Sequence, residues 1–307
     1  MRPSKTRIHR GLVGDRTLVG SRYLSQPDLR REYESEIAPR TEAALRRVLE
    51  QVELESRPRR VLDLGAGTGA AARAVRSCFG DDVELVAVDK VPGPGILVAD
   101  VLRGACPVGV SGRFDLIVAA HLLNELGGSL DLAGRARLVV GWCRDLLEPD
   151  GTCIVIEPAL RDTSRALLGV RDRLLAAGLH VVAPCLCQTP CPALLRDRDW
   201  CHDSAEVLVA GRSRVDFSYL VLRRSAVAEV DRDRYRVVSD PLKDKGRLRF
   251  FVCGAAGRFV LMRLDRDRSA ANQALDRARR GDIMVLPNAL VRDDRIRIAA
   301  DSTVGIG

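Results

Sequence analysis

The stretch RVLDLGAGTGAAARAV, residues 60–75, constrains the fold of this chain more than any other. Its apolar start, residues 61–64, is typical of a buried parallel strand, and an alanine-rich helix follows. The glycines in between let the backbone approach a ligand, and the helix N-terminus offers free N–H groups. These glycines are Gly65, Gly67 and Gly69. The stretch therefore predicts an α/β sheet with a ligand site at its first turn.

Strands and helices alternate after this turn. Apolar runs predict strands at residues 84–89, 96–100, 114–123, 151–158, 180–184 and 215–224. Helical spacing of apolar residues predicts helices at residues 39–55, 135–147 and 164–177. Because the connections are short, we expect a doubly wound, Rossmann-like parallel sheet. The last two strands have no helix between them, which predicts a closing hairpin.

Three acidic residues stand where an adenosyl ligand would need them. Asp63 lies inside the first strand, Asp89 ends the second and Asp100 ends the third. The glycine turn also fits the G-x-G-x-x-A pattern, so a nicotinamide enzyme is an alternative. The order of glycines and acids, with the hairpin, resembles class I methyltransferases. This resemblance implies S-adenosylmethionine as cofactor, held by Asp63, Gly65, Gly67, Gly69, Asp89 and Asp100.

No catalytic residue can be identified. After the fourth strand the chain reads AAHLLNEL in place of an Asn-Pro-Pro-Tyr motif. His121, Asn124 and Glu125 lie at the carboxyl end of that strand, where such sheets bind ligands. Alternatively, Asn124 caps the next helix and His121 is an ordinary polar residue. Glu157, after the fifth strand, either faces the cofactor or simply ends its strand.

Residues 183–203 form a cysteine-rich insertion within the closing hairpin. The insertion holds four of the nine cysteines, and its prolines exclude a regular helix. The chain shows no signal-peptide pattern, so we expect metal binding or buried thiols rather than disulfides. Four isolated cysteines are expected to be ordinary buried side chains: Cys78, Cys106, Cys143 and Cys153.

The spacing within the insertion differs from most zinc ribbons. Five residues separate Cys185 from Cys191, and nine separate Cys191 from Cys201, whereas zinc ribbons favour C-x2-C. Thiolates on irregular loops suit an iron–sulfur cluster at least as well. Zinc and unliganded thiols are the alternatives. The candidates for a fourth ligand are Cys187, Cys253 and His202.

Several motifs resemble the methyltransferase-like proteins of mitochondrial small-subunit ribosome assembly and their bacterial relatives. They are VLDLGAGTG, the NEL and IEP after the fourth and fifth strands, RDRLLAAGLHVVAPC, CP, DWCH and FSYLVL, within roughly residues 55–262. The resemblance implies a structural [4Fe-4S] cluster held by Cys185, Cys191, Cys201 and Cys253, with Cys187 left out. It also implies binding to the small ribosomal subunit and its rRNA. The chain departs from the family at Leu186-Cys187, where a proline–histidine pair is usual, and at Asp203, where phenylalanine is usual.

Charge supports a nucleic-acid partner. The formal net charge is +8, and both ends are basic. Residues 1–24 hold six basic residues and one acidic residue, and residues 243–301 hold fourteen and eight. Because phosphate contacts dominate non-specific affinity, basic ends predict an RNA surface, with a merely solvated surface as the alternative. No apolar run approaches the roughly 20 residues of a membrane span, so we expect no membrane partner.

We expect three parts. Residues 1–55 form a basic arm, flexible to about residue 27, and a leading helix; residues 56–225 form the methyltransferase-like domain; residues 226–307 form a small β-rich domain with a helix at residues 269–280. The expected location is the cytoplasm, or the mitochondrial matrix if the arginine-rich start is a transit peptide. The sequence leaves the oligomeric state open.

The expected function is a methyltransferase-like assembly factor that binds small-subunit rRNA and contains a structural iron–sulfur cluster. The first alternative is an active S-adenosylmethionine-dependent RNA methyltransferase. The second is a zinc-stabilised methyltransferase of a small molecule.

Overall fold

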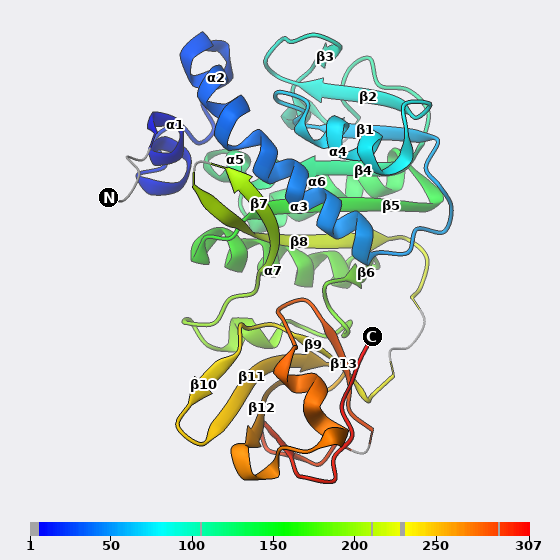
Figure 1. The fold of residues 1–307 in the computed structure, drawn as a ribbon. Helices are drawn as coiled ribbons and strands as arrows, with labels where there is room; N and C mark the ends of the chain where they lie inside the picture. Colours follow the sequence, from blue (N-terminus) through cyan, green and yellow to red (C-terminus); the bar gives the residue numbers. More distant parts are fainter. Residues whose placement is uncertain (1–5, 105, 210, 228–230, 288) are drawn as a thin grey trace.

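The computed structural model describes residues 6–104, 106–209, 211–227, 231–287 and 289–307, and it contains two β-sheets (Figure 1). The first sheet has the order β3-β2-β1-β4-β5-β8-β6, with β7 paired to β8. The second has the order β14-β15-β12-β11-β9-β13-β16, with β10 paired to β11. No helix in these ranges is long and apolar enough to cross a membrane.

The first sheet is mixed rather than purely parallel. Its strands are β1 (Arg60–Leu64), β2 (Glu84–Asp89), β3 (Ile96–Val98), β4 (Phe114–Ala120), β5 (Leu147–Pro158), β6 (His180–Ala183), β7 (Asp203–Val209) and β8 (Arg212–Arg223). Strands β1 to β5 pair in parallel, and β8 lies antiparallel between β5 and β6. This order, with one reversed strand before the last, is that of class I methyltransferases. The predicted fold class is confirmed.

Helices cover both faces of the first sheet because its strands are buried on both sides. Helices α3 (Ala38–Gln51) and α4 (Ala70–Phe79) pack on one face, and α6 (Leu132–Asp145) and α7 (Arg161–Ala176) pack on the other. Neighbouring residues of a strand point to opposite faces of the sheet. Val61 packs in the core under α3 and α4, and Leu62 packs in the core under α6 and α7. The short helix α5 (Leu122–Glu125) follows β4 directly.

The closing hairpin is longer than predicted. The cysteine-rich insertion leads from β6 into β7, and β7 forms a hairpin with β8. Strand β7 is absent from the sequence-based prediction. Strand β8 is 12 residues long. Its second half pairs with β5 and β6, and its first half extends beyond β6 to pair with β7.

The second sheet encloses a hydrophobic core of its own, centred on Phe250, Leu261 and Ile296. Its strands are β9 (Arg234–Val237), β10 (Leu242–Asp244), β11 (Arg247–Gly254), β12 (Gly257–Leu264), β13 (Ile283–Val285), β14 (Val291–Arg292), β15 (Arg295–Ile298) and β16 (Gly305–Ile306). The helix predicted at residues 269–280 is wrong, because a 3-10 helix spans only Ala270–Asp276. The Asn272 side chain accepts from the N-cap Ser269 N–H and donates to the Asp267 carbonyl and to the Ala299 carbonyl of the loop after β15.

The flexible arm predicted up to residue 27 is also wrong for the described residues. From residue 6 the chain forms α1 (Arg7–His9), a π-helical turn (Arg10–Gly14), a 3-10 turn (Tyr23–Ser25) and α2 (Pro27–Glu36). Residues 6–25, here called the N-terminal segment, bury Ile8 completely against Tyr33 of α2 and Ala70 of α4. The turns are too short to leave a hydrophobic period in the sequence.

Candidate functional site

The glycine turn and the ends of β2 and β3 line a cavity of about 500 Å³, here called the glycine cleft. It brings together Gly65, Gly67, Asp89 and Asp100, four of the six residues predicted to hold a cofactor. Gly65 and Gly67 have φ angles of 74° and 56°, which glycine adopts without strain. A Cβ atom on Gly65 would lie 3.1 Å from Leu122.

Asp89 fastens the glycine turn to the end of β2. Its Oδ2 accepts a hydrogen bond from the Gly67 N–H at 2.9 Å, and its Oδ1 accepts one from the Val91 N–H at 2.8 Å. A carboxylate offers about four lone-pair sites, so Asp89 retains acceptors for a ligand. Asp100 caps the 3-10 turn after β3 by accepting from the Leu102 N–H at 2.9 Å.

The other two predicted residues do not line the cleft. Gly69 begins α4 as its N-cap. Asp63 lies beneath the turn with 2% of its surface exposed. Burial, and then the Asp89 charge, raise the pKa of Asp63 to about 7. Its Oδ2 atom is buried without a hydrogen-bond partner in the described part of the chain.

One wall of the glycine cleft comes from the N-terminal segment, which the sequence interpretation had assigned to a flexible arm. The Gly20 N–H and the Tyr23 hydroxyl both donate to the Glu125 carboxylate. Lys90, next to Asp89, donates to the Gly20 carbonyl at 3.0 Å. Burial raises the pKa of Glu125. Glu125 therefore joins the N-terminal segment to the end of β4.

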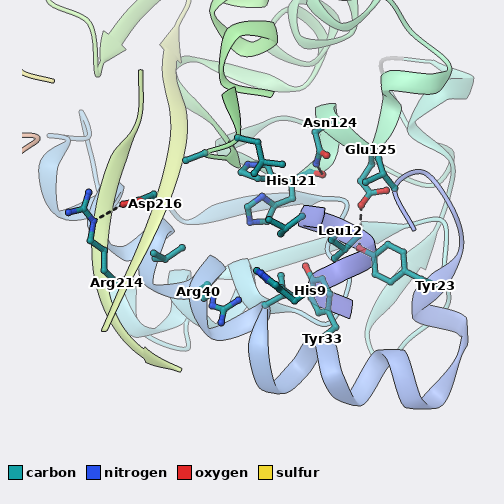
Figure 2. Close-up of a pocket in the computed structure, with 17 residues that line it drawn as sticks. His9, Leu12, Tyr23, Tyr33, Arg40, His121, Asn124, Glu125, Arg214 and Asp216 are labelled. Carbon is teal, nitrogen blue, oxygen red and sulfur yellow. Dashed lines mark hydrogen bonds and ion pairs between the residues drawn. The ribbon is translucent and has the colours of Figure 1, made fainter. Parts of the chain in front are cut away.

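A second cavity of about 250 Å³, here called the side pocket, adjoins the glycine cleft (Figure 2). The two cavities share Val19, Tyr23, Tyr33, His121 and Glu125. The side pocket is further lined by His9, Leu12, Val13, Ile37, Arg40, Asn124, Pro158, Ala159, Leu160, Arg214, Val215 and Asp216.

Glu157 faces neither of these cavities. Its carboxylate accepts from the Leu123 N–H at 2.8 Å and the Asn124 N–H at 3.2 Å, and so caps α5. Burial raises the pKa of Glu157 to about 8. Asn124 does not cap α5 as the alternative expected; its amide donates to the His121 carbonyl at 2.9 Å, and its oxygen accepts from Arg16.

The insertion lines a third cavity between α7, β8 and the second sheet, here called the cysteine cavity. Cys185, Cys191 and Cys201 from the insertion and Cys253 from β11 all face it. Cys187, which is not in the expected ligand set, also lines it. In Figure 1 the insertion lies between α7 and the second sheet. All nine cysteines are free, and contrary to expectation Cys78 and Cys106 are exposed.

Arginine side chains surround these thiols. Arg171 of α7 is fully buried and donates to the Cys185 Sγ at 3.1 Å and to the Cys187 carbonyl at 2.6 Å. On the second sheet, Cys253 pairs with Arg258 on one side and with Arg236 on the other. Paired residues on neighbouring strands point to the same face, so both guanidinium groups accompany Cys253 into the cavity.

Burial is the main influence on the pKa values of the cysteine thiols. It raises the pKa of Cys185 to about 12 and that of Cys191 to about 11, and it also raises the pKa of Cys201 and Cys253. Among the described residues, no group of three or more His, Cys, Asp or Glu side chains is arranged to hold a metal ion.

The strand order and the glycine cleft define a class I methyltransferase-like protein. The sequence matches the family described as mitochondrial small ribosomal subunit Rsm22 over residues 96–283, and the chain belongs to this family. No curated protein matches it.

Solved structures are similar only at low identity. The pyocyanin biosynthetic protein PhzM is 18% identical over 66% of this chain and 61% of its own, with a TM-score of 0.40. The plantazolicin methyltransferase BpumL, in complex with SAH, is 11% identical over 71% and 98%, with a TM-score of 0.43. TrmN from Thermus thermophilus is 21% identical over 59% and 47%, with a TM-score of 0.33. The chain thus spans less than two thirds of PhzM and TrmN.

Proposed function

We propose that this protein is an assembly factor of the small ribosomal subunit. It binds rRNA, holds S-adenosylmethionine in the glycine cleft and contains a structural [4Fe-4S] cluster in the cysteine cavity. Its family carries the name of the small ribosomal subunit. The observation that carries the proposal is the position of Cys253, which reaches from the second sheet into the same cavity as Cys185, Cys191 and Cys201.

The donor set of the cysteine cavity fits a cluster. Each iron of a [4Fe-4S] cluster takes one thiolate, and Cys185, Cys191, Cys201 and Cys253 line the same cavity. The charges also fit, because Arg171, Arg236 and Arg258 line the cavity beside the thiols. Bound there, the cluster would cross-link the insertion to the second sheet.

Metal analysis after anaerobic purification tests this assignment. We expect about four iron and four sulfide per chain, and loss of both in Cys191→Ser and Cys253→Ser. Cys187→Ser is the matched control, because the Cys187 thiol lines the same cavity but is not one of the proposed ligands. Stoichiometric zinc in the native protein, or iron loss only in the control, would contradict the proposal.

The glycine cleft fits the adenosyl cofactor through Asp89, which retains acceptor capacity, and Asp100, which lies in the same cavity. Bound there, S-adenosylmethionine would supply an activated methyl group. Calorimetry with S-adenosylhomocysteine should detect binding that Asp89→Ala abolishes. Asp81→Ala, whose side chain is 92% exposed, should bind normally.

Exposed basic side chains on the second sheet and its connections support an rRNA-binding surface. They are Lys243, Lys245, Arg266, Arg277, Arg279 and Arg292. Other arginines there are neutralised by ion pairs, such as Arg263 and Arg268 with Asp276. Affinity for small-subunit RNA should fall steeply between 50 and 200 mM salt, by roughly 10³-fold if about six phosphates are contacted. A salt-independent affinity would count against this surface. The family description favours the mitochondrial location over the cytoplasmic one.

A further inference from the structure

Arg171 of α7 is a charged side chain with no exposed surface, buried beneath the cysteine-rich insertion. Its guanidinium carries five N–H groups and no acceptor, and it makes five hydrogen bonds. Nε donates to Cys185 Sγ at 3.1 Å. Nη1 donates to Asp172 Oδ1 at 2.6 Å and to the Thr189 carbonyl at 2.9 Å. Nη2 donates to the Cys187 carbonyl at 2.6 Å and to Cys187 Sγ at 3.7 Å. The insertion is therefore folded around this guanidinium as a whole.

Asp172, the next residue of α7, bonds the far end of the same loop. Its Oδ1 and Oδ2 both accept from the Cys191 N–H at 3.0 Å. Arg171 and Asp172 together hold the backbone at residues 187, 189 and 191, which follows Cys185 and ends at Cys191. These bonds join protein groups only, so they position two of the proposed ligands before a cluster binds.

The bond from Arg171 Nε–H to Cys185 Sγ also bears on the charge of a cluster. A [4Fe-4S] cluster becomes more negative when it takes up an electron, and hydrogen bonds to its sulfurs help to set its reduction potential. An N–H donor directed at a ligand sulfur stabilises the more negative, reduced state. Because Arg171 is fully buried, water does not weaken this bond.

We propose that Arg171 is a positioning residue for the cluster, which fixes Cys185 as a ligand and raises the reduction potential of the cluster through the Nε–H···Sγ bond. The proposal rests on the [4Fe-4S] cluster of the proposed function. Reduction adds one electron, taken from a chemical reductant such as dithionite. No proton is exchanged with Arg171, because a guanidinium does not deprotonate in proteins.

A second arginine of α7 provides the matched control. Arg165 Nη1 donates to the carbonyls of Ala193, Arg196 and Asp199 at 3.2, 2.8 and 2.6 Å. Arg165 thus fastens a later part of the insertion to the same helix. Within the described residues, none of its hydrogen bonds goes to a sulfur.

Potentiometry of the anaerobically purified, full-length protein tests the proposal, with dithionite as reductant and EPR as the readout. Dithionite should reduce the native cluster. Arg171→Lys keeps the positive charge but loses the planar fork of donors. At the native midpoint potential its ratio of reduced to oxidised cluster should be at least tenfold lower, which corresponds to a shift of about 59 mV. Arg165→Lys should match the native protein.

Asp172→Asn tests the same bond when Arg171→Lys does not fold or does not retain iron. The asparagine Oδ1 can still accept from Arg171 and from the Cys191 N–H, which both bond Oδ1 of Asp172. The substitution removes a negative charge beside the guanidinium, so the reduced cluster should become more stable. The ratio of reduced to oxidised cluster should therefore rise, in the direction opposite to Arg171→Lys.

The outcomes separate the two proposals. Native protein that contains no iron would overturn the proposed cluster and this inference with it. An iron-loaded native protein that dithionite does not reduce would overturn the inference alone. So would equal potentials in the native protein and Arg171→Lys, an equal fall in Arg171→Lys and Arg165→Lys, or a potential in Asp172→Asn that does not rise.

Discussion

At the scale of single residues, the burial of Asp63 makes the free energy of unfolding depend on pH. Its carboxyl lies under the glycine turn, and burial together with Asp89 raises its pKa to about 7, whereas an unfolded aspartate titrates near 3.8. Below the unfolded pKa both states are protonated, so Asp63 has no effect on stability. As pH rises through this interval the unfolded state ionises first, and stability is lost until the folded carboxyl also ionises.

Asp63→Asn should therefore stabilise the protein at pH 8 and have little effect at pH 4. Linkage gives an upper figure of about 4 kcal/mol for a shift of roughly three pKa units. Urea unfolding at both pH values measures the difference. Asp81→Asn, on an exposed loop, should show no such dependence. An equal effect of Asp63→Asn at both pH values would show that Asp63 ionises normally.

At the scale of elements, the N-terminal segment is a small folded unit that depends on a few buried side chains. Ile8 is fully buried, and Glu32 of α2 accepts a hydrogen bond from the Ile8 N–H at 2.8 Å. The same segment supplies walls to both the glycine cleft and the side pocket. Both cavities therefore keep their walls only while the N-terminal segment is folded.

Ile8→Ala should loosen this segment before it affects the two sheets. Loss of a fully buried isoleucine costs about 2–5 kcal/mol. Hydrogen exchange should become faster across residues 6–25 while the strands of the first sheet keep their protection. Ile306→Ala, at a side chain 39% exposed, is the matched control. Uniformly faster exchange would instead indicate global destabilisation.

At the scale of the whole molecule, Arg236 joins the second sheet to the first. Its guanidinium donates to Asp203 Oδ2 at 2.7 Å, to the Tyr219 hydroxyl at 2.8 Å and to Gln51 Oε1 at 3.0 Å. These partners lie on β7, β8 and α3. The buried charge of Asp203 is matched by Arg236.

Arg236→Met should leave Asp203 buried without its cation, at a cost of about 3–5 kcal/mol. For a chain of this size the melting temperature should fall by about 10 °C, and the two sheets should unfold in separate calorimetric transitions. Arg234→Met, an exposed position on the same strand, should melt like the native protein. A single, unshifted transition would show that Arg236 does not couple the sheets.

Local patterns predicted much of the first sheet and of the glycine cleft. The apolar run before Gly65 and the acids that end β2 and β3 lie next to one another because parallel strands share a carboxyl edge. The same rule could not predict which acids are reachable. Asp63 is buried because its side chain points beneath the turn, an orientation that depends on the helix packed above it.

Side chains that act through distant partners were harder to predict. Glu125 holds Gly20 and Tyr23, more than 100 residues away along the chain, and the N-terminal segment was therefore mistaken for a flexible arm. Strand β7 was missed because it lies next to prolines and cysteines that dominate the local pattern. The helix expected at residues 269–280 is a shorter 3-10 helix, and helix propensity does not register the bond between the Asn272 amide and the distant Ala299 carbonyl.

The sequence alone determined the strand–turn–helix at residues 60–75, the alternation that builds the first sheet and the cysteine-rich stretch at residues 183–203. These features depend on residues that are close together in the chain, so the sequence pattern predicts them. Only the tertiary structure decided that Cys187 shares the cysteine cavity, that the N-terminal segment forms a wall of the glycine cleft and that His121 lines both the glycine cleft and the side pocket. Each of these depends on burial and on contacts between segments far apart in the chain, which hydrophobic periodicity does not encode.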